Sequence, residues 1–103
     1  MRIIKEIEFE KVVKEAKGLV LVDFFTEWCG YCELLVPELE SAEKEVEGLT
    51  IVKVNAEEAP NLMDEYNIEF FPLILLFKDG KLVDHIDGYV KKDVIIKKVK
   101  EYM

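Results

Sequence analysis

The two cysteines of the chain lie within one short segment, Trp28-Cys29-Gly30-Tyr31-Cys32. An apolar run typical of a β-strand precedes this segment, and an amphipathic helical pattern follows it. Two sulfurs separated by one helical turn can close a small disulfide ring and reopen it, which exchanges two electrons with another dithiol. The spacing therefore predicts a redox-active pair.

The two thiols are expected to differ, because Cys29 falls at the amino terminus of the predicted helix. Unpaired backbone N–H groups and the helix dipole favour a thiolate there, which predicts Cys29 as the attacking thiol. Cys32 lies one turn inside the helix and is expected to be the more buried, resolving thiol. The alternatives are an inert disulfide and two buried free thiols.

A metal site is not expected within one molecule. Zinc needs four ligands, and besides the cysteines the chain has a single histidine, His85, which we interpret as a surface residue of a strand. No bound cofactor is expected either. The alternative is that two molecules pool their cysteines around zinc or an iron–sulfur cluster.

Asp23 is the one acid in the apolar run Leu19–Phe25. An ionised carboxylate in a buried strand costs several kcal/mol unless it is paired or protonated, which indicates a function for this residue. The alternative is an acid at a strand end that reaches solvent.

The remaining patterns predict the elements that position these residues. Apolar runs predict buried strands over 19–25 and 49–54, and Asp79-Gly80 between two further runs predicts an antiparallel hairpin over 73–77 and 81–86. Helical periodicity is found over 9–16, from the cysteines to Gly48 with a kink at Pro37, over 59–66 and over 94–102. The order of elements predicts an α/β fold: one domain over 1–103, with a mixed sheet of four to five strands flanked by about four helices.

Composition narrows the choice of partners. The chain has 103 residues and a net charge of −8, which argues against binding to nucleic acid or anionic lipid, so the expected partners are other proteins. No apolar run approaches the roughly 20 residues that span a bilayer, and the amino terminus lacks the pattern of a secretory signal. A cytoplasmic monomer is expected.

From about Ile3 to Tyr102 the sequence resembles the thioredoxin family. The resemblance rests on an ordered set of motifs at the family's spacing: Val22-Asp23-Phe24, Glu27-Trp28-Cys29-Gly30-Tyr31-Cys32, Pro37, Phe71-Pro72, Phe77-Lys78-Asp79-Gly80 and Gly88. It implies the thioredoxin fold and a disulfide oxidoreductase activity. The implied partners are disulfide-containing substrate proteins and a reductase, here unidentified, that recharges the dithiol.

The resemblance also implies roles for single residues. Asp23 would take a proton from Cys32, with Lys53 on the neighbouring strand as its charge partner; the alternative for Lys53 is an exposed strand residue. Pro72 would follow a cis peptide bond beside the cysteines, and the backbone of Phe71 would pair with an extended substrate segment.

Four more residues complete the implied substrate-binding set. Trp28 would pack beside the thiols and shield them, with a plain core aromatic as the alternative. Gly30, Tyr31 and Gly88 would line the surface around the cysteines.

Several residues depart from the family pattern. Tyr31 stands where Pro is typical and restores a backbone N–H that could stabilise the Cys29 thiolate. Glu27 and Glu33 add negative charge, which acts against a thiolate. The sign of the resulting shift in reduction potential stays open. Phe25 and Asp87 also depart from it and bear on partner choice. The sequence predicts a protein-disulfide reductase. The alternatives are a disulfide oxidase or isomerase, a glutaredoxin-like protein and a binding module without redox turnover.

Overall fold

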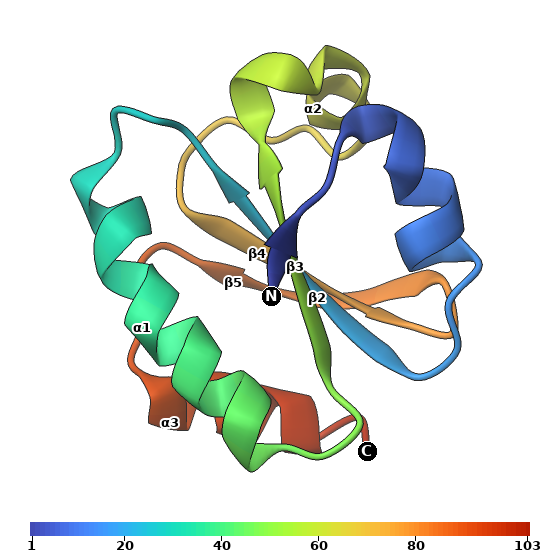
Figure 1. Ribbon diagram of the computed structural model, residues 1–103, viewed down its shortest axis with the longest axis vertical. Helices are drawn as coiled ribbons and strands as arrows, with labels where there is room; N and C mark the ends of the chain where they lie inside the picture. Colours follow the sequence, from blue (N-terminus) through green and yellow to red (C-terminus); the bar gives the residue numbers. More distant parts are fainter.

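The computed structural model describes all residues from Met1 to Met103 and contains one five-stranded mixed sheet (Figure 1). Its strands are ordered β1–β3–β2–β4–β5, where β1 is Arg2–Ile3, β2 Leu19–Phe25, β3 Thr50–Asn55, β4 Leu73–Lys78 and β5 Lys81–Asp87. β2 pairs in parallel with β3 and antiparallel with β4, and β5 is antiparallel to β4. The predicted mixed sheet is confirmed. The two-residue strand β1 was not predicted.

Helices cover both faces of this sheet (Figure 1). One face carries α1 (Gly30–Glu45) and α3 (Lys92–Lys100), which contact each other. The other carries α2 (Pro60–Glu65) and two short turns near the amino terminus, η1 (Glu6–Glu8) and η2 (Glu10–Lys14), while a third turn, η3 (Ala56–Glu58), precedes α2. None of these helices is long and apolar enough to cross a membrane.

The central strand β2 divides the core into two layers, because successive side chains of a strand point to opposite faces. The even positions of β2 pack with the amino-terminal turns and α2, in a cluster that includes Val20, Val22, Phe24, Phe9, Val13 and Leu62. The odd positions pack with α1 and α3, in a cluster that includes Leu19, Leu21, Leu35, Leu39, Ile95 and Val99. This alternation places Asp23 on the α1 face.

The predicted first helix differs from expectation. Its buried face is as predicted, with Phe9 and Val13 in the core. Its backbone, however, forms a 3₁₀ turn, η1, followed by the π-helix η2, in which the Glu15 N–H donates to the Glu10 carbonyl at 3.0 Å. Apolar periodicity indicates which side of a segment is buried. It does not show whether each backbone N–H bonds to the carbonyl three, four or five residues earlier, which is what distinguishes 3₁₀, α and π helices.

The hairpin between β4 and β5 turns at Asp79-Gly80, as predicted. Asp79 has φ 50° and Gly80 has φ 83°, and this pair of positive values is what a type I′ turn requires. The Gly18 N–H donates to Oδ1 of Asp79 at 2.8 Å, which ties the hairpin to the start of β2.

We expect Gly80→Ala to lower the free energy of unfolding by at least about 2 kcal/mol. An L residue is strained at this φ, and the added Cβ would overlap the carbonyl oxygen of Lys14. Gly18→Ala is the matched control: φ is 81° there, but a Cβ meets no atom within 4 Å, so only the backbone strain of about 1 kcal/mol remains. Urea unfolding measures both losses, and equal losses would contradict the effect of the Lys14 contact.

Candidate active site

The cysteine pair lies where β2 passes into α1. Cys29 and Cys32 form a disulfide with their Cα atoms 5.2 Å apart, so the alternative of two free thiols is wrong for this structure. Cys29 is the N-cap residue of α1 and its Sγ accepts a hydrogen bond from the Cys32 N–H at 3.1 Å. Cys29 is half-buried, whereas Cys32 is 3% exposed. The two sulfurs therefore differ in access in the predicted sense.

Asp23 lies wholly inside the protein. The residue is 0% exposed and neither carboxylate oxygen has a hydrogen-bond partner, so the alternative of an acid that reaches solvent is wrong. Burial raises the pKa of Asp23 to about 7, and the positive charge of Lys53 lowers it by a smaller amount. Asp23 thus changes its charge near neutral pH.

Lys53 stands beside Asp23 in the parallel register of β2 and β3. No hydrogen bond joins the two side chains, and the Lys53 ammonium lies 4.4 Å from the centroid of the Phe25 ring. The alternative of an exposed strand residue is wrong, because Lys53 is half-buried. Lys53 and Cys32 instead line a common cleft of about 230 Å³, together with Phe25, Thr26, Glu27, Glu33 and Val36.

A groove of about 340 Å³ contains most of the predicted substrate-binding residues. It is lined by Tyr31, Phe71, Pro72, Gly88 and Tyr89. The Phe71–Pro72 peptide bond is cis, as the resemblance implies, and the Gly88 N–H donates to the Pro72 carbonyl at 2.9 Å. Residues from α1, the β4 entry and the β5 exit therefore meet at one surface.

Tyr89 is the groove residue that sequence reasoning missed. Its ring lies 6.4 Å from that of Tyr31, centroid to centroid, at an interplanar angle of 39°. The only signal was an aromatic residue directly after Gly88, and nothing in the local pattern related it to a helix that begins nearly sixty residues earlier.

Trp28 does not match its predicted environment. It is 88% exposed, so the core-aromatic alternative is wrong and most of its side chain faces solvent. The cause is local: Glu27 and Trp28 form a turn between β2 and α1, which directs the side chain outward. Gly30 begins α1 and shares a shallow exposed surface with Tyr31 and Leu34.

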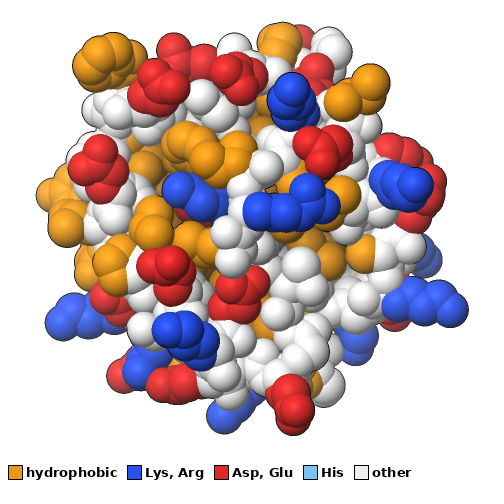
Figure 2. Space-filling model, viewed as in Figure 1, with side chains coloured by type: hydrophobic (Ala, Val, Ile, Leu, Met, Phe, Trp, Pro, Cys, Tyr) orange, Lys and Arg blue, Asp and Glu red, His pale blue; other side chains and the backbone are white.

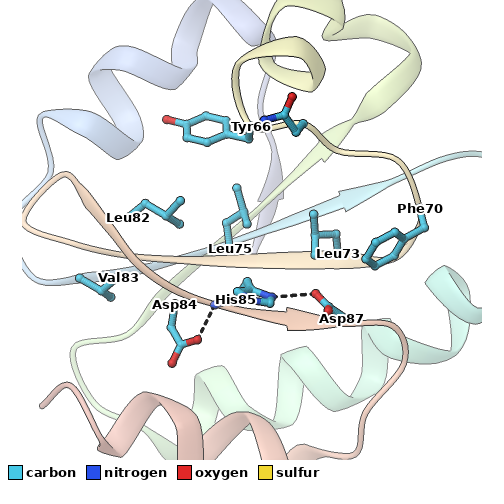
Figure 3. Close-up of a pocket in the computed structure, with 10 residues that line it drawn as sticks. Tyr66, Phe70, Leu73, Leu75, Leu82, Val83, Asp84, His85 and Asp87 are labelled. Atoms are coloured by element: carbon cyan, nitrogen blue, oxygen red, sulfur yellow. Dashed lines mark hydrogen bonds and ion pairs between the residues drawn. The ribbon is translucent and has the colours of Figure 1, made fainter.

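A larger cavity of about 520 Å³ lies away from the cysteines, between the Tyr66–Phe70 loop and β5 (Figure 3). It contains the exposed pair of His85 and Asp87, with Nδ1 and Oδ1 2.8 Å apart. His85 is therefore a surface strand residue, as predicted. Neither this cavity nor any other part of the chain groups three side chains that could hold a metal ion.

Thiol–disulfide exchange is the chemistry that a four-residue disulfide ring at a helix amino terminus supports. Fold and site together define the class, a thiol–disulfide oxidoreductase built on a mixed α/β sheet. The family model described as Thioredoxin matches residues 1–101, and the chain belongs to the thioredoxin family.

Proteins described as thioredoxins are similar to this chain over most of its length. A thioredoxin of Chlamydia caviae is 46% identical over 87 residues, which is 84% of this chain and 85% of the relative. A thioredoxin of Chlorobaculum thiosulfatiphilum is 38% identical over 96 residues, or 92% of this chain and 89% of the relative. An M-type chloroplastic thioredoxin of Chlamydomonas reinhardtii is 40% identical over 96 residues, or 92% of this chain and 69% of the relative.

Proposed function

We propose that this oxidoreductase works as a protein-disulfide reductase, with Cys29 as the attacking thiol and Cys32 as the resolving thiol. The observation that carries the proposal is the asymmetry of the pair: Cys29 caps α1 and is half-exposed, while Cys32 is buried one turn further in. A substrate disulfide can approach Cys29, and Cys32 is held close enough to finish the exchange.

The proposed reaction has two displacements. The Cys29 thiolate attacks one sulfur of the substrate disulfide, a mixed disulfide forms, and the other substrate sulfur leaves as a thiolate that takes a proton from solvent. The Cys32 thiol loses its proton, attacks Sγ of Cys29 and releases the second substrate sulfur. Two electrons pass to the substrate, which becomes a dithiol, and the Cys29–Cys32 disulfide is restored.

Asp23 is the proposed acceptor of the Cys32 proton. A carboxyl whose pKa is raised to about 7 by burial is close to half ionised at neutral pH, where a general base works best. Lys53, which pairs with Asp23 in the register of β2 and β3, lines the same cleft as Cys32, and this neighbourhood supports a transfer of the proton through water. Lys53 supports the ionised form of Asp23 through its charge.

The groove is the proposed substrate contact. An extended segment that carries the substrate cysteine would pair with the backbone of Phe71 and lie against Pro72, Tyr31 and Gly88. A separate reductase must return the Cys29–Cys32 disulfide to the dithiol after each turnover. The dithiol persists between turnovers in a reducing compartment, and we propose the cytoplasm.

The reduction potential of the Cys29–Cys32 couple, measured in glutathione buffers, tests the direction of electron flow. A reductase is expected near the thioredoxin value of about −270 mV. A value between about −180 and −120 mV would contradict the proposal and favour an oxidase or isomerase. Insulin reduction with dithiothreitol is the companion assay, and an inactive wild type would favour a binding module.

A further inference from the structure

We propose that Tyr31, Tyr89 and an acidic rim around the disulfide select substrates that carry Lys or Arg beside the reactive cysteine. This inference rests on the proposed reductase function and adds the substrate class to it. It is based on the two tyrosines that line the groove and on the charges of the segments around it.

The two tyrosines form an aromatic wall of the groove. Their ring centroids lie 6.4 Å apart, Tyr31 is 65% exposed and Tyr89 is half-buried. An aromatic face attracts a cation placed over it, and Arg and Lys are the cations that a peptide offers. Tyr31 directly precedes Cys32 in α1, so the wall begins one residue from the disulfide.

Acidic side chains outnumber basic ones beside the disulfide: Glu27 and Glu33 line the cleft that contains Cys32, and Lys53 is the one cation that lines it with them. The segments 27–34, 69–72 and 87–89, which supply the disulfide and the groove, contain four acidic residues and no Lys or Arg. All four are exposed: Glu27, Glu33, Glu69 and Asp87. Glu27 and Glu33, which line the cleft with Cys32, form the acidic rim. Figure 2 shows hydrophobic side chains projecting at the upper left, near the start of α1 in Figure 1, with acidic side chains beside them.

Neighbouring cations offset only part of this negative charge, because Lys53 alone lines the cleft with Glu27 and Glu33. Lys53 is half-buried and its ammonium faces the Phe25 ring. Lys91 is exposed but lies beyond the groove segments, and Lys92 forms an ion pair with Glu45. Asp87 precedes the groove residue Gly88, but its carboxylate contacts His85 and lines the separate cavity between the Tyr66–Phe70 loop and β5. With a net charge of −8 on the whole chain, the surface attracts a basic segment and repels an acidic one.

Two synthetic peptides test the selection directly. Each is closed by one disulfide, and they differ only in having Lys or Glu on both sides of one cysteine. The rate constant for reduction by the reduced protein is measured by stopped flow, and each rate is divided by that for dithiothreitol to remove intrinsic reactivity. We expect a Lys-over-Glu preference of about tenfold or more at low salt, falling at 0.5 M salt as charges are screened.

Substitutions distinguish the effect of the two tyrosine rings from that of the acidic rim. Tyr89→Leu is expected to reduce the preference about threefold, and Tyr89→Phe to keep it, because the ring and not the hydroxyl attracts the cation. Tyr31→Leu, at an exposed position, is a second test of the wall. Glu33→Gln removes one charge of the rim and is expected to lower the salt dependence of the preference. Glu47→Gln, beyond the other end of α1, is the matched control for loss of one exposed charge and is expected to leave the preference unchanged.

The outcomes distinguish this inference from the function on which it rests. Equal normalised rates for the two peptides would overturn the selection while leaving the reductase function intact. A preference that survives in both Tyr89→Leu and Tyr31→Leu would overturn the role of the aromatic wall. A reduced protein that reduces neither peptide would overturn the reductase function, and this inference with it.

Discussion

Cys29→Ser is expected to abolish reduction of insulin, with a loss of more than about 10³-fold, whereas Cys32→Ser is expected to stop after the first displacement. A serine hydroxyl at position 29 is not ionised at neutral pH, so no nucleophile meets the substrate. With serine at position 32, the Cys29 thiolate still attacks, but nothing releases it from the mixed disulfide. Mass spectrometry after mixing with a disulfide peptide should find the covalent adduct for Cys32→Ser alone.

The two variants control for each other. Each removes the same four-residue ring, which is worth about 2 kcal/mol on the chain-entropy estimate, so a general loss of stability would affect both alike. A stable adduct on Cys29→Ser with none on Cys32→Ser would reverse the roles of the two cysteines. That result would contradict the assignment made from the exposure of Cys29 and the burial of Cys32.

Asp23→Asn is expected to raise the free energy of unfolding of the disulfide form relative to wild type. This margin should increase by about 4 kcal/mol between pH 4 and pH 8. The pKa of Asp23 is about 7 in the folded protein, against 3.8 for an ordinary aspartate. Between these values the unfolded chain releases the proton and the folded protein keeps it. Stability due to the protonated carboxyl is therefore complete below about pH 4 and is lost as the pH rises through 7.

Urea unfolding of both proteins across this pH range measures the margin. Other titrating groups are common to both proteins and cancel in the difference. Lys53→Met is a useful companion: it removes the charge that lowers the pKa of Asp23, so the wild-type decline in stability should extend to higher pH. A margin between Asp23→Asn and wild type that is independent of pH would show that Asp23 titrates normally in the folded protein.

Much of the frame that positions the site follows from local patterns. The apolar runs 19–25 and 49–54 predicted β2 and β3 because central parallel strands are buried on both faces. Asp79-Gly80 predicted the hairpin because few other residues accept two consecutive positive φ values. Asp23 could be identified in the same way, because an ionised acid in a buried strand costs free energy whatever the strand packs against.

Other features depend on contacts between distant segments. β1 has only two residues and is specified by its pairing with Val52 and Lys53, so it has no period to detect. The exposure of Trp28 depends on the direction of a turn, and the contact of the Lys53 ammonium with the Phe25 ring depends on the pairing of β2 with β3. Tyr89 reaches Tyr31 only after β5 has paired with β4.

The groove is assembled from three separate stretches of chain, whereas the disulfide ring occupies a single helical turn. Apart from Tyr31, which lies between the two cysteines, the residues proposed to contact a substrate protein therefore come from other parts of the sequence than the cysteines. On the proposed function, a substitution of Tyr89 would change which substrate proteins bind without altering Cys29, Cys32 or Asp23. Among proteins of this fold, the reduction potential of the cysteine pair and the choice of substrate protein can therefore change separately.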